Sequence, residues 1–264
     1  MNSMMKKSIT IIAGCNRDGN KETFGELTLN RGETISIVGP TGSGKTALIT
    51  DIELLAYDDS VTKRRVLVDG ERPSDEMRFS PLCKPVAMLS QNTKCFSDMY
   101  VEDFISIHAR ARGITSVDIL DKVLDMSNRF TGEKITKKVR VTELSGGQTR
   151  SLLVADAILI GASPIILLDE IENAGIDKNE IVKIMKQIDD KLIIFVTHDP
   201  LIALQTEKRI VMANGSVQKI IERTNYEKEL VKELVNVNLK ISELRELVRK
   251  DRVVRENNLF AHGF

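Results

Sequence analysis

The sequence has no net charge, no paired cysteines and no long uninterrupted apolar run. Its 264 residues include 38 Lys and Arg and 38 Asp and Glu, so the formal net charge is zero. Proteins that bind nucleic acid or anionic membrane surfaces usually present a basic field, and no such field extends over this chain. We therefore expect no nucleic-acid partner.

Cysteine usage indicates a reducing compartment. The three cysteines, Cys15, Cys83 and Cys95, are odd in number and form no C-x-x-C pair, which is typical of free thiols. The apolar stretch 9–12 near the N-terminus is too short for the core of a signal peptide. We expect a cytoplasmic protein.

The longest apolar stretch, 151–168, is interrupted by Asp156, Gly161 and Pro164. These residues divide it into a buried helix and a buried strand, which excludes a membrane span. The 42% apolar content supports a substantial core. No internal repeat or low-complexity tract is present.

Short β-branched runs alternate with amphipathic stretches, which is typical of an α/β protein whose parallel strands are joined by helices. Strands are predicted near 9–12, 26–29, 34–38, 65–68, 86–89, 165–168, 192–196, 209–212 and 217–220. Helices are predicted near 45–55, 101–112, 117–128, 146–160, 178–190, 201–206 and 227–256. The stretch at about 97–142 has little strand character and is interpreted as a helical insertion.

The pattern changes after Gln218. Apolar residues then recur at alternating spacings of about three and four, which predicts an amphipathic helix about 45 Å long at 1.5 Å per residue. They are Tyr226, Leu230, Leu234, Val237, Ile241, Leu244 and Val248. The apolar stripe either folds back onto its own domain or forms a seam with a partner. We expect one domain over 1–221 and a helical extension over 222–264.

A phosphate-binding loop follows the strand 34–38. The motif G-x-x-x-x-G-K-[ST] lies between this strand and an apolar-periodic helix, which is the context that the motif requires. Its glycines let backbone N–H groups converge on phosphate oxygens, Lys45 reaches the β and γ phosphates, and the Thr46 hydroxyl faces Mg²⁺. We expect ATP and Mg²⁺ as ligands. The predicted nucleotide contacts are Gly39, Pro40, Thr41, Gly42, Ser43, Gly44, Lys45, Thr46 and Ala47.

Two adjacent acids end the buried strand 165–168. Ligands bind at strand ends of open parallel sheets, so Asp169 is predicted to hold Mg²⁺ through its water shell. Glu170 is then placed to orient or deprotonate the water that attacks the γ-phosphate. An isolated Asp-Glu pair would more often be a solvated turn, but the phosphate loop upstream favours the catalytic interpretation.

The pentapeptide Leu144-Ser-Gly-Gly-Gln148 follows the phosphate loop by about a hundred residues, and the pair resembles the ATP-binding cassette (ABC) ATPase family. The segment 86–91 resembles the family strand that ends in the Q-loop glutamine, here Gln91, and 192–199 resembles the switch-histidine strand, which carries His198. The resemblance covers about residues 9–220. It implies a P-loop NTPase, an ABC-type cassette with a mixed sheet, an inserted helical subdomain and a C-terminal amphipathic helix.

The same resemblance implies an ATP hydrolase and assigns roles at its site. Gln91 contacts Mg²⁺ and senses the γ-phosphate, whereas His198 hydrogen-bonds the γ-phosphate and helps to align the attacking water. The catalytic set is then Lys45, Glu170 and His198, and the metal set is Thr46, Gln91 and Asp169.

The pentapeptide also carries a consequence for assembly. Ser145, Gly146 and Gly147 precede a helix and make a second anion cradle, to which Gln148 also belongs. One ATP has one γ-phosphate, which the phosphate loop already holds. In the family the second cradle closes on the ATP of an opposing cassette, so the resemblance implies a homodimer or a pair with a related ATPase.

Two features depart from transport cassettes. After the catalytic Glu these usually have Pro and a short segment that ends in Ser-Ala-Leu-Asp, whereas this chain has no Pro and one extra residue over 171–177. They also stack adenine on an aromatic residue near the N-terminus. Phe24 is the nearest candidate here and is equally a candidate core residue.

Three functions remain open. The first is a soluble cassette that remodels or reactivates a partner enzyme, and the segments 22–27 and 169–177 faintly resemble the ATPase subunit of a reactivase for cobalamin-dependent lysine or ornithine aminomutases. The alternative is the nucleotide-binding, energy-coupling subunit of a membrane ABC transporter, peripheral at the inner membrane beside membrane-spanning subunits. A DNA-repair ATPase ranks last, because the chain lacks a long coiled-coil arm and basic charge.

Overall fold

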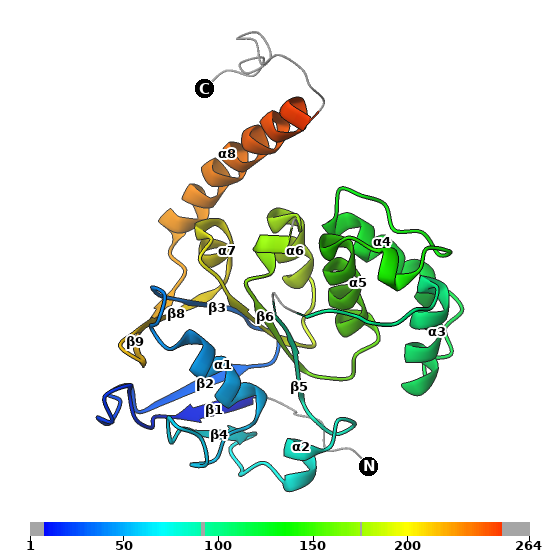
Figure 1. Cartoon of the computed structure of the whole chain (residues 1–264). Coiled ribbons are helices and arrows are strands. Elements are labelled where there is room, and N and C mark those ends of the chain that lie inside the picture. Colours follow the sequence, from blue (N-terminus) through cyan, green and yellow to red (C-terminus); the bar gives the residue numbers. More distant parts are fainter. Residues whose placement is uncertain (1–7, 91–92, 175, 250–264) are drawn as a thin grey trace. The chain divides into compact units, whose positions relative to one another are not determined.

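The computed structural model describes residues 8–90, 93–174 and 176–249. The chain forms two compact units, 1–222 and 223–264, each of which is described by itself. The first unit contains both sheets and seven α-helices within its described residues (Figure 1). The second contains helix α8, Asn225–Arg249.

The strands lie where the sequence predicts them, to within two residues. They are β1 Ser8–Ile12, β2 Glu26–Asn30, β3 Thr34–Val38, β4 Arg65–Val68, β5 Val86–Leu89, β6 Ile165–Asp169, β7 Leu192–Val196, β8 Lys208–Ala213 and β9 Ser216–Glu222. The other helices are α1 Lys45–Glu53, α2 Asp75–Phe79, α3 Val101–Ala111, α4 Ile119–Phe130, η1 Val141–Glu143, α5 Gly146–Leu159, η2 Ile171–Ala174, α6 Lys178–Met185 and α7 Pro200–Gln205.

Helices α1 and α4 have ends that differ from the prediction by two residues, and three other helices also depart from it. The predicted helix 178–190 ends at Met185, because i to i−3 hydrogen bonds from Gln187 and Ile188 tighten its last turn. The sequence did not predict α2, a single turn capped by Ser74 that buries no residue and so leaves no apolar period. Helix α8 begins two residues earlier than predicted, and the predicted part beyond 249 lies outside the described residues.

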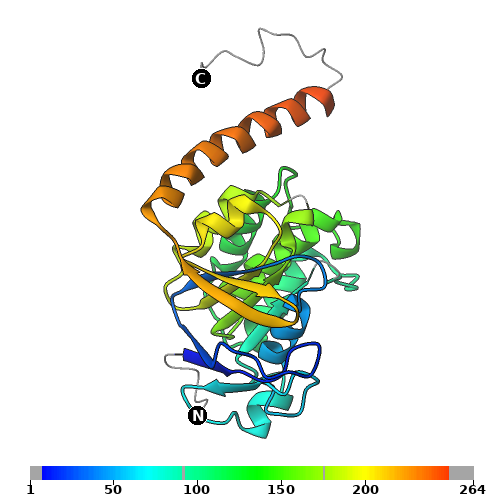
Figure 2. The same cartoon turned by 90° about the vertical axis from the view of Figure 1, so that its left-hand side faces the viewer.

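The strands form two sheets. The larger has the order β5-β6-β7-β3-β8-β9, in which β9 alone is antiparallel to its neighbour and lies at one edge (Figure 2). The smaller sheet is antiparallel with the order β2-β1-β4. The mixed sheet that the family resemblance implies is therefore present.

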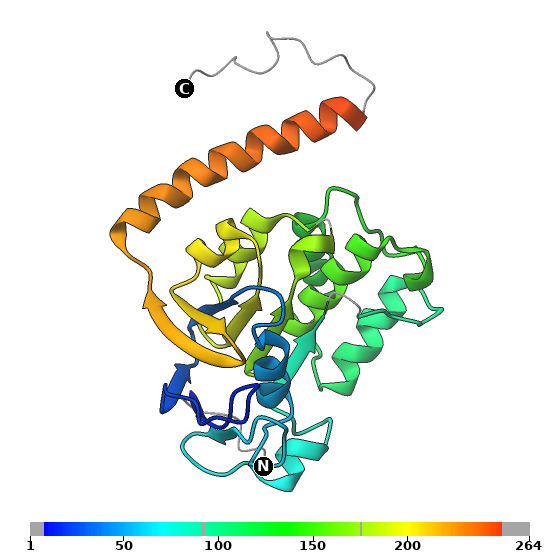
Figure 3. The same ribbon diagram turned by 60° about the vertical axis from the view of Figure 1, so that its left-hand side comes forward.

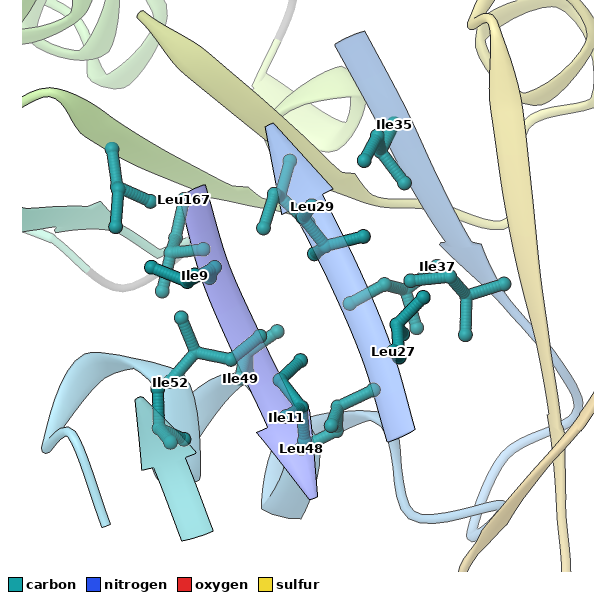
Figure 4. Packing of buried hydrophobic residues seen from close by; sticks show 14 of the residues in the cluster. Ile9, Ile11, Leu27, Leu29, Ile35, Ile37, Leu48, Ile49, Ile52 and Leu167 are labelled. Carbon is teal, nitrogen blue, oxygen red and sulfur yellow. The ribbon is translucent and has the colours of Figure 1, made fainter. Parts of the chain in front are cut away.

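Side-chain alternation along the strands builds a core on each face of the larger sheet. Ile165 and Leu167 of β6 face α1 and the smaller sheet, whereas Ile166 and Leu168 face α5, α6 and α7. Figure 4 shows apolar side chains of β1, β2 and β3 gathered with those of α1. Helix α1, which follows the phosphate loop, is thus fixed between two sheets.

A third core joins the inserted helices to the main body. Apolar residues of α3 and α4 pack against α5, with Val101, Phe104, Val123 and Leu152 among the buried members. Figure 3 shows these three helices gathered at one side of the unit. Helix α5 belongs to both this core and the second, so it connects the insertion to the larger sheet.

The stretch 151–168 forms a helix and a strand, as predicted, and the break falls at Gly161 and Pro164. Over the described residues, the structure contains no helix with the length and apolar character needed to cross a membrane. The three cysteines are free thiols, also as predicted.

A fully buried ion network lies beneath the phosphate loop. The Arg64 guanidinium, with no exposed side-chain surface, contacts Glu22 at 2.7 Å and Asp51 of α1 at 3.1 Å, and it donates to the Gly215 carbonyl at 2.7 Å. Burial opposes the charge on Arg64, but the hydrogen bonds and charges of Glu22 and Asp51 outweigh it and raise the pKa of the guanidinium. One side chain thus connects three separate parts of the chain.

Removal of this guanidinium should destabilise the fold. Arg64→Met keeps much of the volume but leaves two buried carboxylates unpaired, so we expect the free energy of unfolding to fall by about 3–5 kcal/mol. Lys122→Met, which breaks an exposed ion pair with Asp118 on α4, is the matched control and should cause no measurable change. Urea titration followed by circular dichroism measures both; equal losses in the two variants would contradict the role of the network.

Candidate active site

Three parallel strands bring the predicted catalytic segments to one sheet edge. Ile37 of β3 pairs with Val196 of β7, and Val196 also pairs with Asp169 of β6. The phosphate loop begins just beyond β3, and His198 lies just beyond β7. The carboxyl ends of β3, β6 and β7 are therefore neighbours, although β3 is more than a hundred positions from the other two strands in sequence.

The phosphate loop requires glycine at two contact points. A Cβ on Gly39 would lie 2.3 Å from the Met212 carbonyl oxygen, and one on Gly44 would lie 2.7 Å from the Cα of Gly215. Both glycines have positive φ, 154° and 97°. The loop is further joined to the β8–β9 turn by a 3.0 Å hydrogen bond from the Gly215 N–H to the Ser43 carbonyl.

Lys45 is buried at the start of α1. Its ammonium donates to the carbonyls of Gly39 at 2.8 Å and Pro40 at 3.1 Å. Burial lowers the pKa of Lys45, and the charges of Glu170 and Asp169 oppose this change. The predicted catalytic cation and the two predicted acids are therefore close enough to interact. Thr46 and Ala47 follow on the exposed side of the helix.

Three acidic residues, Asp169, Glu170 and Glu172, lie together at the end of β6, with Lys45 and His198 as the basic residues that act on Asp169. Burial raises the pKa of Asp169, and the charges of Glu170 and Glu172 raise it further, whereas Lys45 and His198 lower it. Within the described part of the chain, no group of three or more His, Cys, Asp or Glu is placed to hold a metal ion alone. Oxygen donors and excess negative charge beside a phosphate loop nevertheless suit Mg²⁺, with Thr46 and Asp169 as the residues that would hold it.

Glu170 and His198 form a direct pair. The Nε2 atom of His198 lies 3.2 Å from Oε1 of Glu170, and the His198 side chain is 46% exposed. Glu170 adopts a left-handed backbone with φ of 49°, and its N–H donates to the Val196 carbonyl at 2.9 Å. The predicted base and the predicted γ-phosphate contact thus face one another at the sheet edge. Their assigned roles in hydrolysis stay predictions.

The pentapeptide at 144–148 caps helix α5. Ser145 is the N-cap, its hydroxyl accepts from the Gln148 N–H at 3.3 Å, and the Gln148 side chain accepts from the Ser145 N–H at 2.9 Å. The helix begins at Gly146, as predicted, so Gly146 and Gly147 form its first turn and only Ser145 precedes it. Their N–H groups lie at the positive end of the helix dipole, as an anion cradle requires.

The pentapeptide and the phosphate loop lie in separate cavities. Leu144 and Gly146 line one cavity together with residues 93–96, whereas Gly42–Thr46 line another, and the two have no residue in common. The two anion cradles of one copy therefore line different cavities. Gln91, the remaining predicted contact, lies outside the described residues.

The sequence interpretation missed Arg17. This exposed residue lines the cavity of about 360 Å³ above Gly42–Thr46, and its backbone packs against Gly215. Arg17 lies in an irregular loop, where no periodicity or motif marks it. Phe24, the sequence candidate for adenine stacking, is instead partly buried against the first core, which favours its structural alternative.

Arg17 should strengthen nucleotide binding, because a guanidinium can stack on a base or pair with phosphate. We expect Arg17→Ala to weaken ATP binding about three- to ten-fold, in line with an exposed cation contact. Lys21→Ala, in the same loop but outside the cavity lining, should leave the affinity unchanged. Titration with a fluorescent ATP analogue measures both; equal affinities in the two variants would exclude the contact.

Comparison with known sequences places the chain in a family. A family profile described as "ABC transporter" matches residues 25–173. The "Uncharacterized ABC transporter ATP-binding protein MJ0121" of Methanocaldococcus jannaschii is 50% identical over 92% of this chain and 93% of its own length. The spermidine/putrescine import ATP-binding protein PotA of Mannheimia succiniciproducens is 28% identical over 83% of this chain, and the match covers 59% of PotA. The chain thus spans little more than half of that import protein.

Solved structures support the same fold. The structure of cbiO1 from Clostridium perfringens, described as part of the ABC transporter complex cbiONQ, has a TM-score of 0.61 at 22% identity and covers 92% of this chain and 100% of its own. A dimeric post-hydrolysis structure of the ATP-binding cassette MJ0796 bound to ADP and Pi has a TM-score of 0.60 at 22% identity, over 82% of this chain and 99% of its own. With the 50% identical relative and the matched profile, these findings establish that the chain belongs to the ABC transporter ATP-binding family and is an ABC-type ATPase.

Proposed function

We propose that the chain is the nucleotide-binding, energy-coupling subunit of a membrane ABC transporter, peripheral at the membrane. One observation carries the proposal: a phosphate loop, an acidic pair and a histidine meet at one sheet edge in a chain that is 50% identical to an ABC transporter ATP-binding protein. The import proteins among the relatives support the same role. The transported substrate is outside the proposal.

Each residue at the sheet edge would have a separate role in ATP hydrolysis. Backbone N–H groups of the loop and Lys45 would hold the β and γ phosphates, and Glu170 would take the proton of the attacking water. His198, 3.2 Å from Glu170, would align the γ-phosphate and this water. Mg²⁺, when bound with ATP, would neutralise phosphate charge.

Assembly follows from the separate cavities. The pentapeptide does not line the cavity of its own phosphate loop, so we infer that it faces a second cassette and that two copies, or this chain and a related ATPase, would enclose two nucleotides. The dimeric MJ0796 cassette supports this arrangement by its fold. Membrane-spanning subunits are the proposed receivers of the resulting motion.

The soluble remodelling hypothesis receives less support. The relatives described above are named as transporter ATP-binding proteins, and none is named as a reactivase or as acting on an aminomutase. The faint resemblance through 22–27 has a structural explanation instead, since Glu22 is a buried partner of Arg64. The transporter alternative is therefore the better supported of the two.

Replacement of Glu170 tests the chemistry. Glu170→Gln cannot take a proton, so it should bind ATP but hydrolyse it at least about a hundred-fold more slowly and accumulate as a closed dimer. Glu207→Gln, an exposed acid at the opposite end of the sheet, is the control. Phosphate release and light scattering after size exclusion measure the two effects. Wild-type turnover in Glu170→Gln would show that another group is the base.

Partner capture tests the transporter role. We expect a tagged chain, purified from detergent-solubilised membranes in the presence of ATP, to bring down proteins with several membrane spans. Mass spectrometry identifies them, and a tagged Lys45→Ala variant controls for nucleotide-dependent association. Recovery of soluble enzymes alone would reject the transporter role and restore the remodelling hypothesis.

A further inference from the structure

We propose that Glu172 is a positioning residue of the ATPase site, which holds the backbone of His198 so that its imidazole faces Glu170. The inference rests on the proposed function of this edge in ATP hydrolysis. It goes beyond the family motifs, because Glu172 lies in the segment where the chain departs from the pattern of transport cassettes.

The carboxylate of Glu172 contacts the end of β7 at two points. Its Oε1 accepts a hydrogen bond from the Thr197 hydroxyl and another from the His198 N–H, the latter at 3.2 Å. Thr197 is completely buried. A charged acceptor makes both bonds stronger than neutral ones would be. The 3₁₀ turn η2 that follows the acidic pair is thereby fixed to the residue before the histidine and to the histidine itself.

Both sides of this contact are themselves held in place. Ile171, the residue before Glu172, is 1% exposed and belongs to the second core. On the other side, the Thr197 hydroxyl accepts from the Asp199 N–H at 2.9 Å, and Asp199 caps α7 and forms an ion pair with Lys178. Glu172 therefore connects a rigid turn to a rigid helix start.

The imidazole depends on this connection because packing does not hold it. The His198 side chain is 46% exposed, and its ion-pair contact is with Glu170 at 3.2 Å. A shift of the β7 end would therefore move the imidazole directly. Displacement of an aligning group by about 1 Å can cost about a hundred-fold in rate.

The two carboxylate oxygens of Glu172 are used unequally. Oε1 accepts both hydrogen bonds, whereas Oε2 is buried and has no hydrogen-bond partner among the described residues. The two hydrogen bonds to Oε1 carry the proposed role. An amide at this position retains an acceptor oxygen, whereas a methyl group does not.

A series of variants tests the role in the purified full-length chain. We expect Glu172→Ala to lower kcat for ATP about ten- to a hundred-fold with KM changed less than about two-fold, because ground-state binding does not use His198 alignment. Glu172→Gln should stay within about three-fold of wild type. Thr197→Val removes the hydroxyl that donates to Glu172 and accepts from the Asp199 N–H, and it should also lower kcat. It carries the test if thermal melting shows that Glu172→Ala is unfolded.

A double-variant cycle separates positioning from general stability. If Glu172 acts through His198, then Glu172→Ala combined with His198→Ala should be no slower than His198→Ala alone. Additive losses, a Glu172→Gln variant as slow as Glu172→Ala, or wild-type kcat in Glu172→Ala would each overturn the inference. Absence of ATP hydrolysis in the wild-type chain would instead refute the proposed function, so the two failures are distinguishable.

Discussion

The buried guanidinium of Arg64 is the interaction on which the geometry of the site depends. It joins Glu22 in the N-terminal loop to Asp51 in α1 and to the carbonyl of Gly215. The N–H of Gly215 in turn binds the phosphate loop at Ser43. Because the charged groups of Arg64, Glu22 and Asp51 are buried, movement of one of them would leave another without its partner. The phosphate loop is thus held through Gly215 by the Arg64 network, without a contribution from a ligand.

Much of the fold could be predicted because its strands are short and strongly apolar. The run at β7 and the alternation at β3 mark buried strands without ambiguity, and the glycine motif between β3 and α1 carries its own mechanism. The site prediction followed from chain order, since the carboxyl ends of parallel strands gather at one edge. The predicted start of α8 is two residues too late, because the capping box that Thr224 forms with Glu227 was not used to place it.

The rest depended on tertiary contacts that leave no local pattern. Arg17 reaches the phosphate-loop cavity only because its loop packs against Gly215, and α2 has no apolar face to reveal it. From the sequence, Arg64 would be expected at the surface, because most arginines are exposed, yet it is completely buried. For Glu172, the sequence offers one indication of a special role, its place in the segment that departs from the family pattern. Its hydrogen-bond partner Thr197 lies 25 positions away, so no local pattern connects the two.

The separation of the two anion cradles has a genetic consequence. If two copies pair as proposed, each nucleotide is enclosed by the phosphate loop of one copy and the pentapeptide of the other. The unit that carries activity is then the pair, and a defect in one copy is expressed at the site of its neighbour. In a pair of one intact copy and one copy with an altered pentapeptide, the impaired site would be the one at the phosphate loop of the intact copy, and the other site would be complete.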